Sequence, residues 1–266
     1  MKILVLIKYS LDISEIKVDP TSRELRLAGV PEKIGNIDRN AVEAALRLRE
    51  KSGGRVQVLC LGPEVARDGF RDVLAMGVDE ATLVVDPFGG LAEASVAVRI
   101  LEAAIRKLGY FDLILNGFAS DDGYTYQTGP RLAERLNLPL VSYARQLSVT
   151  DEVLKADRDL EEHLQSVEVS LPALVSVAEE AFPPRRTTLM DALNAKKKPV
   201  SLWTLEAELG LSKAALEQEQ EVESSTRTGI VVFRKQQMFK GLSPLEAADR
   251  VIDALLQDGA LKGAGC

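Results

Sequence analysis

The residues with the clearest chemical potential lie in one stretch, 116–130, which reads Asn-Gly-Phe-Ala-Ser-Asp-Asp-Gly-Tyr-Thr-Tyr-Gln-Thr-Gly-Pro. Its glycines allow the main chain to approach a ligand closely, and its end should begin a helix, where N–H groups and the helix dipole favour a phosphate. Thr125, Gln127 and Thr128 add hydroxyl and amide donors. An ordinary capped loop is the alternative, but the density of donors and the Gly129-Pro130 pair favour a nucleotide-phosphate site.

Two further loops are weaker candidates for the same site. The stretch 35–38 ends in Asp38, a candidate N-cap, and Gly62-Pro63 is a common way to begin a helix, with Pro63 at its first position. Each alone favours a structural role, but loops that follow parallel strands meet at one edge of a sheet. Aliphatic walls for an adenine ring would come from Leu6, Ile7 and Leu61.

Residues that could carry out catalysis are scarce. No Ser-His-acid set and no metal-ligand cluster can be assembled around His163, the single histidine. The pair Asp121-Asp122 resembles part of a metal site, although orienting its loop and capping a helix is the favoured role. Two cysteines, Cys60 and Cys266, cannot build a disulfide framework and indicate a reducing compartment. We expect no catalytic residues and no metal.

The elements that must position these loops alternate between strand and helix in the first half of the chain. Continuous aliphatic runs predict strands buried on both faces, and stripes with helical spacing predict helices between them. The expected strands are 2–8, 56–61, 81–85 and 111–115, and the expected helices are 38–53, 62–76, 91–108 and 127–136. This order predicts an α/β fold with a doubly wound parallel sheet, interrupted by a hairpin over 12–33.

The pattern changes after residue 139. The stretches 141–149, 152–156 and 163–169 alternate polar and apolar residues and predict an antiparallel edge, whereas 174–177 returns to a buried strand.

Beyond residue 182 few core positions remain, apart from an expected strand at 230–233 and a helix over 243–256 that begins with a Ser243–Glu246 capping box. Trp203 is expected to anchor this part on a partner. We therefore expect a nucleotide-binding domain over 1–182 and a C-terminal arm and partner-docking segment over 183–266.

Composition narrows the function classes. The 266 residues carry a net charge of −7, and the longest basic run is Lys196-Lys197-Lys198, so the chain is a poor candidate for nucleic-acid binding. No apolar run approaches the length of a membrane span, and the run at 3–7 is too short for a signal peptide. These features predict a cytoplasmic protein without a transmembrane segment.

Several motifs together resemble the beta subunit of electron-transfer flavoproteins. They are the strand that ends in Lys8, the helix beginning Ala41-Val42-Glu43-Ala44, Ala75-Met76-Gly77, Asp122-Gly123-x-Thr125-x-Gln127-Thr128-Gly129-Pro130, and the run from Pro184 to Met190 with Ala195 to Lys198. The resemblance implies a Rossmann-like fold whose C-terminal arm embraces an alpha subunit. The cap loop departs from the family's usual Asn-Pro-x-Asp.

The combined cofactor-binding set that we expect lies at the strand ends and in the loops. It comprises Leu6, Ile7, Lys8, Asn36, Asp38, Leu61, Gly62, Asn116, Gly117, Asp121, Asp122, Gly123, Tyr124, Thr125, Gln127, Thr128 and Gly129.

The form of the motif implies which flavoprotein group the chain resembles. Thr125 and Pro130 are similar to the bifurcating and nitrogen-fixation-associated members, which hold a second FAD in the beta subunit. There, NADH delivers a hydride to that FAD, one electron passes to a ferredoxin-type acceptor, and the other passes to the alpha-subunit flavin. Such NADH oxidation would require the complex with the alpha subunit. Acyl-CoA dehydrogenase-like enzymes or a quinone oxidoreductase are the other implied partners.

Two alternatives remain open at this point. One is a simple electron shuttle with structural AMP in the beta subunit, and the other is a stand-alone adenine-nucleotide-binding sensor.

Overall fold

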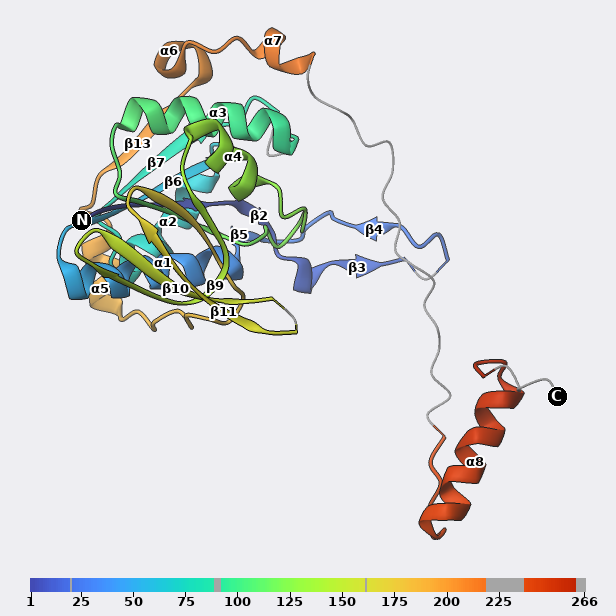
Figure 1. The fold of residues 1–266 in the computed structure, drawn as a ribbon. Helices are drawn as coiled ribbons and strands as arrows, with labels where there is room; N and C mark the ends of the chain where they lie inside the picture. Colours follow the sequence, from blue (N-terminus) through green and yellow to red (C-terminus); the bar gives the residue numbers. More distant parts are fainter. Residues whose placement is uncertain (20, 89–91, 161, 219–236, 262–266) are drawn as a thin grey trace. The chain divides into compact units, whose positions relative to one another are not determined.

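The computed structural model is organised around a nine-stranded sheet in the order β11-β10-β9-β12-β8-β1-β6-β7-β13 (Figure 1). It describes the whole chain except residues 20, 89–91, 161, 219–236 and 262–266. Contacts divide the chain into two units, 1–227 and 228–266, and each is described by itself. The strands of the sheet are β1 (Lys2–Ile7), β6 (Arg55–Gly62), β7 (Glu80–Val85), β8 (Leu113–Gly117), β9 (Leu140–Thr150), β10 (Val153–Asp159), β11 (Leu164–Ser170), β12 (Ala173–Val177) and β13 (Val200–Trp203).

The sheet is parallel from β9 to β13, and β10 and β11 form an antiparallel edge beside β9. The register places Val5 of β1 between Val58 of β6 and Leu115 of β8. Apolar residues dominate these strands because both of their faces are covered. The prediction of a doubly wound parallel sheet with an antiparallel edge is confirmed.

Helices cover both faces of this sheet (Figure 1). Alternate residues of β1 point in opposite directions, so that Val5 packs with α1 and α2, and Leu4 packs with α3. The four long helices of this unit are α1 (Asn36–Ser52), α2 (Ala66–Met76), α3 (Ala94–Leu108) and α4 (Thr128–Leu136). Helices α2, α3 and α4 each follow a strand of the sheet, and the chain returns to the end of β1 before α1, where Gly35 N donates to the Lys8 carbonyl. All four helices therefore begin near the edge where the carboxyl ends of the parallel strands lie.

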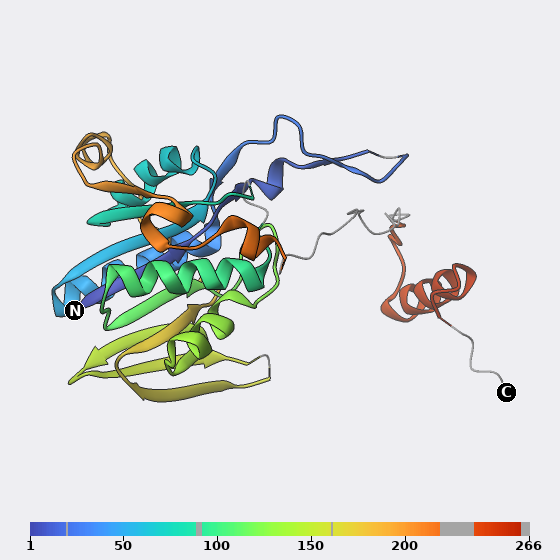
Figure 2. The ribbon, with the colours of Figure 1, turned by 90° about the horizontal axis from the view of Figure 1, so that it is seen from above.

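The segment between β1 and α1 forms two small two-stranded antiparallel sheets, one of which is the predicted hairpin. It consists of β2 (Tyr9–Leu11), a 3₁₀ turn η1 (Ile13–Glu15), β3 (Lys17–Val18), β4 (Leu25–Arg26) and β5 (Glu32–Ile34). Strand β3 pairs with β4, and β2 pairs with β5. Figure 2 shows the β3–β4 hairpin extending away from the sheet.

Two predicted helix starts are wrong. The N-cap of α1 is Gly35 rather than Asp38, which lies buried inside the first turn. Helix α2 begins at Ala66, after a turn, so Pro63 is not its first residue. The start of α1 was misplaced because its capping contact comes from a distant loop. The start of α2 was misplaced because a turn, in which Ala66 N donates to the Pro63 carbonyl, precedes the helix.

Residues 189–217 contradict the expectation of few core positions beyond residue 182. This part contains α5 (Leu189–Ala195), β13, α6 (Leu205–Leu209) and α7 (Lys213–Glu217). Strand β13 extends the sheet beside β7, and Leu205 and Leu216 are buried in the core. Trp203 packs against that core with Lys107 Nζ 5.0 Å from its ring centre, which contradicts its expected role as an anchor on a partner.

An ion-pair network fastens the segment after β12 to α1. Arg185 Nε donates to Glu43 Oε2 at 2.8 Å, and Arg47 Nε donates to Glu43 Oε1 at 2.8 Å. Burial raises the pKa of Glu43, but the bonds from the two arginines outweigh it and leave the pKa below its ordinary value. The docking role of 183–266 stays a prediction.

The second unit contains α8 (Pro244–Gln257), which begins with the predicted Ser243–Glu246 capping box. Its apolar side chains are exposed, including Leu245, Val251 and Ile252. The predicted strand at 230–233 lies outside the described residues.

Candidate functional site

The loop between β8 and α4 reaches the start of α1. Asp121 Oδ2 accepts a hydrogen bond from Asn36 N at 2.8 Å, and Asp121 Oδ1 accepts from Ile37 N at 3.5 Å. The two donors belong to the first turn of α1, so the Asp121 carboxylate caps that helix from 85 positions away in the sequence. The N-terminus of α1 is therefore already neutralised by an anion of the protein itself.

Lys8, at the end of β1, joins the same loop to α1. Its backbone N donates to Asp38 Oδ2 at 2.7 Å, and its Nζ lies 2.7 Å from Asp122 Oδ2. Burial raises the pKa of Asp122, but Lys8 outweighs this and holds the pKa below its ordinary value. The two aspartates thus fix the end of β1 and the loop after β8 relative to each other.

Asp38 lies beneath this edge and is 6% exposed. Its pKa is raised to about 7, first by burial and then by the nearby Asp121, although bonds from the Lys8 and Gly117 backbones oppose the change. A Cβ on Gly117 would lie 2.7 Å from Asp38 Oδ1, so this close packing requires glycine at position 117.

Helix α4 starts differently from α1. Among the described residues, no side chain caps α4, and its first turn contains no acidic residue. The side chains of Thr125, Gln127 and Thr128 make no hydrogen bond within the described part of the chain. An anion can therefore be bound here by main-chain N–H groups together with these three side chains.

Gly129 brings α4 close to the sheet. A Cβ at this position would lie 2.6 Å from Ser176 Oγ and 3.0 Å from Asn116 Nδ2. Both neighbours are buried, and Ser176 Oγ donates to Asn116 Oδ1 at 3.2 Å. Packing within the protein thus requires glycine here, whatever the ligand.

The remaining predicted residues lie deeper or farther from this loop. Leu6 and Ile7 are each 5% exposed and belong to the two core clusters on opposite faces of the sheet. Leu61 is partly buried, and the Gly62 carbonyl accepts from Asp86 N at 2.8 Å. Their contacts to a ligand, like those of the whole predicted set, stay predictions.

The sequence analysis missed two polar residues at this edge, Ser176 and Glu179. Ser176 lies in β12 against the start of α4, and Glu179 follows β12 and accepts a hydrogen bond from Tyr124 Oη at 3.1 Å. Strand 174–177 was predicted, and the rule that identified the other loops points equally to its carboxyl end.

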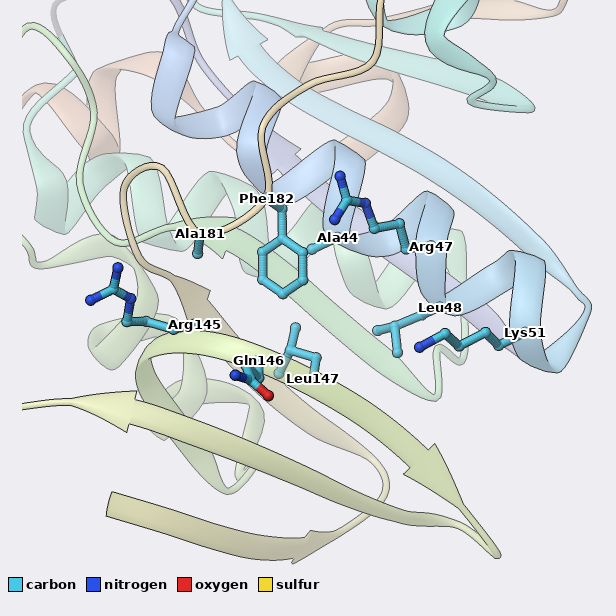
Figure 3. Close-up of a pocket in the computed structure, with 9 residues that line it drawn as sticks. All are labelled: Ala44, Arg47, Leu48, Lys51, Arg145, Gln146, Leu147, Ala181 and Phe182. Atoms are coloured by element: carbon cyan, nitrogen blue, oxygen red, sulfur yellow. The ribbon is translucent and has the colours of Figure 1, made fainter. Parts of the chain in front are cut away.

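A cavity of about 270 Å³ lies elsewhere, between α1 and β9 (Figure 3). Its lining includes Arg47, Leu48, Arg145, Leu147 and Phe182, and it contains none of the predicted site residues. Figure 3 shows the Phe182 ring pointing toward Leu147, with Arg145 turned away from it. The start of α4 is the better candidate, because its donors lie close together in the sequence at the carboxyl-end edge of the strands, where open parallel sheets bind ligands.

Comparisons with known proteins identify the family. The model of the electron transfer flavoprotein domain matches residues 25–208. The electron transfer flavoprotein subunit beta of Thermoanaerobacterium thermosaccharolyticum is 39% identical over 205 residues, which cover 77% of this chain and 78% of that protein. The chain belongs to the electron transfer flavoprotein beta-subunit family.

Two other relatives of this beta-subunit chain carry more specific names. The caffeyl-CoA reductase-Etf complex subunit CarD of Acetobacterium woodii is 35% identical over 216 residues, covering 81% of this chain and 82% of that protein. Protein FixA of Azorhizobium caulinodans is 34% identical over 211 residues, covering 77% and 75% respectively.

The described residues of this family member contain no group of three or more His, Cys, Asp or Glu side chains arranged to hold a metal ion. Within the same residues, no helix has the length and hydropathy needed to cross a membrane.

Proposed function

We propose that this chain binds FAD at the start of α4 and acts, in the cytoplasm, as the beta subunit of a heterodimeric electron transfer flavoprotein that takes part in flavin-based electron bifurcation from NADH. The observation that carries the proposal is the uncapped N-terminus of α4, which directly follows the Asp122-Gly123-x-Thr125-x-Gln127 motif. This motif and Pro130 resemble the bifurcating members of the family.

The residues at this edge fit a pyrophosphate. Main-chain N–H groups of Thr128 and Gly129 and the hydroxyls of Thr125 and Thr128 would bind its oxygens, since the first turn of α4 adds no repelling carboxylate. Asp121 and Asp122 hold the loop in place through α1 and Lys8. Bound FAD would supply the hydride and single-electron chemistry, and the protein would supply its position and electrostatic environment.

Two apolar surfaces support the proposed partners. On α5, Leu189 is 79% exposed and Met190 65% exposed, and the Thr188–Asp191 capping box fixes the helix start. We propose that this surface contacts an acyl-CoA dehydrogenase-like enzyme or a quinone oxidoreductase, and that the apolar side of α8 packs on an alpha subunit. A ferredoxin-type protein would be the low-potential acceptor.

One observation favours a second candidate, a shuttle subunit that holds AMP. Asp121 closes the N-terminus of α1, which leaves the start of α4 to bind phosphate, and one helix N-terminus suffices for the single phosphate of AMP.

The nucleotide content of the purified heterodimer tests the proposal directly. Mass spectrometry of the ligand released on denaturation separates FAD from AMP, and bifurcation requires about two flavins per heterodimer. About one flavin with stoichiometric AMP, and no gain on adding FAD, would refute the FAD assignment and support the shuttle.

Thr125→Asn tests the residue that the motif singles out. The larger side chain should reduce FAD occupancy of the beta subunit, since it takes space beside a pyrophosphate, and it should leave the alpha-subunit flavin intact. Thr150→Asn, an exposed substitution at the end of β9, is the matched control and should leave both occupancies unchanged.

A further inference from the structure

Aromatic side chains gather beside the start of α4. Phe118, Tyr124, Tyr126 and Tyr143 form this aromatic cluster, although aromatic residues make up only 5% of the chain. The Phe118 ring lies in the middle, with centroids 5.6 Å from Tyr124, 5.4 Å from Tyr126 and 5.8 Å from Tyr143. The Tyr124 and Tyr126 rings are perpendicular, at 88°, with centroids 5.3 Å apart. Three members belong to one loop and Tyr143 to β9, so the cluster joins two elements.

The two outer rings are exposed. Tyr126 is 40% exposed and Tyr124 is 43% exposed, whereas Phe118 and Tyr143 are partly buried behind them. The Tyr124 hydroxyl donates to Glu179 at 3.1 Å, which fixes that ring at the edge. The loop itself is tied down by Asp121 on α1. The rings are therefore held in place before any ligand arrives. A ligand that contacts them loses little binding free energy to the ordering of these side chains.

We propose that Tyr126, supported by Tyr124, is a stacking surface for the planar heteroaromatic ring of the nucleotide whose phosphate lies at the start of α4; this inference rests on the function proposed above. Tyr126 precedes Thr128, the first residue of α4, by two positions, so a ring linked to a phosphate there lies within reach of the cluster. Purine and isoalloxazine rings share the flat π-surface that stacks on aromatic side chains.

These tyrosines occupy the two unspecified positions of the Asp-Gly-x-Thr-x-Gln motif. The stacking surface would therefore be a feature of this chain, separate from the motif residues that face the phosphates. Tyrosine suits such a role because its ring is apolar while its hydroxyl remains compatible with water.

The test is a comparison of ligands with and without a ring. Tyr126→Asn removes the ring and keeps the backbone, because position 126 has φ 61° and asparagine tolerates this left-handed conformation. ADP, FMN and inorganic pyrophosphate are titrated into the purified alpha–beta complex after release of its resident nucleotides. The variant should bind ADP or FMN roughly tenfold more weakly and bind pyrophosphate as the wild type does. Tyr126→Phe, which retains the ring, should restore nucleotide affinity.

The control and the opposing outcomes separate this inference from the proposed function. Tyr110→Asn removes an exposed ring at the opposite edge of the sheet, between α3 and β8, and should change no affinity. A loss of ADP affinity alone indicates an adenine on the cluster, and a loss of FMN affinity alone indicates the flavin ring. If Tyr126→Asn binds the nucleotides as the wild type does, or loses pyrophosphate affinity to the same extent, the stacking role is overturned. If nucleotide affinity is unchanged but the variant associates more weakly with the alpha subunit, the cluster belongs to the protein interface instead. Wild-type complex that binds no nucleotide at this edge overturns the proposed function as well.

Discussion

Asp38→Asn should remove a pH dependence of stability that this chain carries between pH 3.8 and about 7. The Asp38 side chain is buried under the loop edge, where its Oδ2 accepts a hydrogen bond from Lys8 N. Burial opposes ionisation more strongly than the two backbone bonds favour it, so the folded state binds a proton more tightly than the unfolded state does.

The size of the effect follows from the two pKa values. The difference between 3.8 and about 7 corresponds to about 4 kcal/mol. Because the folded state holds more protons than the unfolded state in this range, the contribution of Asp38 to the free energy of unfolding falls as the pH rises and levels off above about 7. Asparagine carries no charge at any pH in this range. Any change in the free energy of unfolding that arises from its altered hydrogen bonds should therefore be the same at every pH.

Urea unfolding of both proteins at fixed protein concentration, across this pH range, measures the difference directly. The free energy of unfolding of Asp38→Asn minus that of the wild type should rise with pH by up to about 4 kcal/mol, because titration of the other groups cancels in the subtraction. The infrared band of a protonated carboxyl, present near neutral pH in the wild type and absent from the variant, is an independent readout. A pH-independent difference in stability would refute the reasoning, since Asp38 would then titrate as an exposed aspartate does.

Three further predictions test the contacts that hold the edge and α1 in place, each by chemical denaturation. Asp121→Ala should destabilise the chain by about 1 kcal/mol because it uncaps α1; an effect near zero contradicts the capping role. Gly129→Ala should cost about 1–3 kcal/mol through the clash with Ser176, and Ser176→Ala should recover part of this loss, whereas strictly additive effects would contradict that contact. Arg185→Ala should cost about 3 kcal/mol because it leaves the buried Glu43 carboxylate with one arginine, and a loss below about 0.5 kcal/mol would show that Arg47 alone suffices.

The central sheet could be predicted because its signal is local. Strand β1 is aliphatic from Ile3 to Ile7, and β6 and β8 contain the shorter apolar runs 58–61 and 113–115, which are typical of strands covered on both faces. The helix starts were harder, since the donors of Asn36 and Ile37 are satisfied by a carboxylate from another loop. No local pattern around residue 36 contains that information.

Strand β13 shows a second limit of local prediction. It has four residues, Val200 to Trp203, and its one partner among the described strands is β7, at the end of the sheet. So short an apolar run between a lysine cluster and a polar helix does not stand out by periodicity. Its place depends on an open edge of β7 that the sequence does not reveal, and the burial of Leu205 and Leu216 follows from that pairing.

The candidate site was predictable where its chemistry depends on residue type and less so where it depends on contacts. The donors before α4 could be predicted from their residue types and spacing. The need for glycine at positions 117 and 129 could not, because it comes from close packing against Asp38 and Ser176, and the sequence does not show that these residues lie nearby. A glycine-rich loop therefore does not by itself show that a ligand approaches closely, since packing within the protein can require the same residue.

The loop after β8 assigns opposite roles to the N-termini of α1 and α4. It supplies Asp121 to α1, so an approaching phosphate would meet a carboxylate there, and it supplies no carboxylate to the first turn of α4. A helix N-terminus attracts an anion most strongly when no protein carboxylate already occupies it. Since Asp122 is also paired, with Lys8, both aspartates of this loop are used within the protein, and neither lies in the first turn of α4. The same loop carries Tyr126 two residues before α4, so the proposed nucleotide would meet its phosphate donors and its stacking ring in one segment.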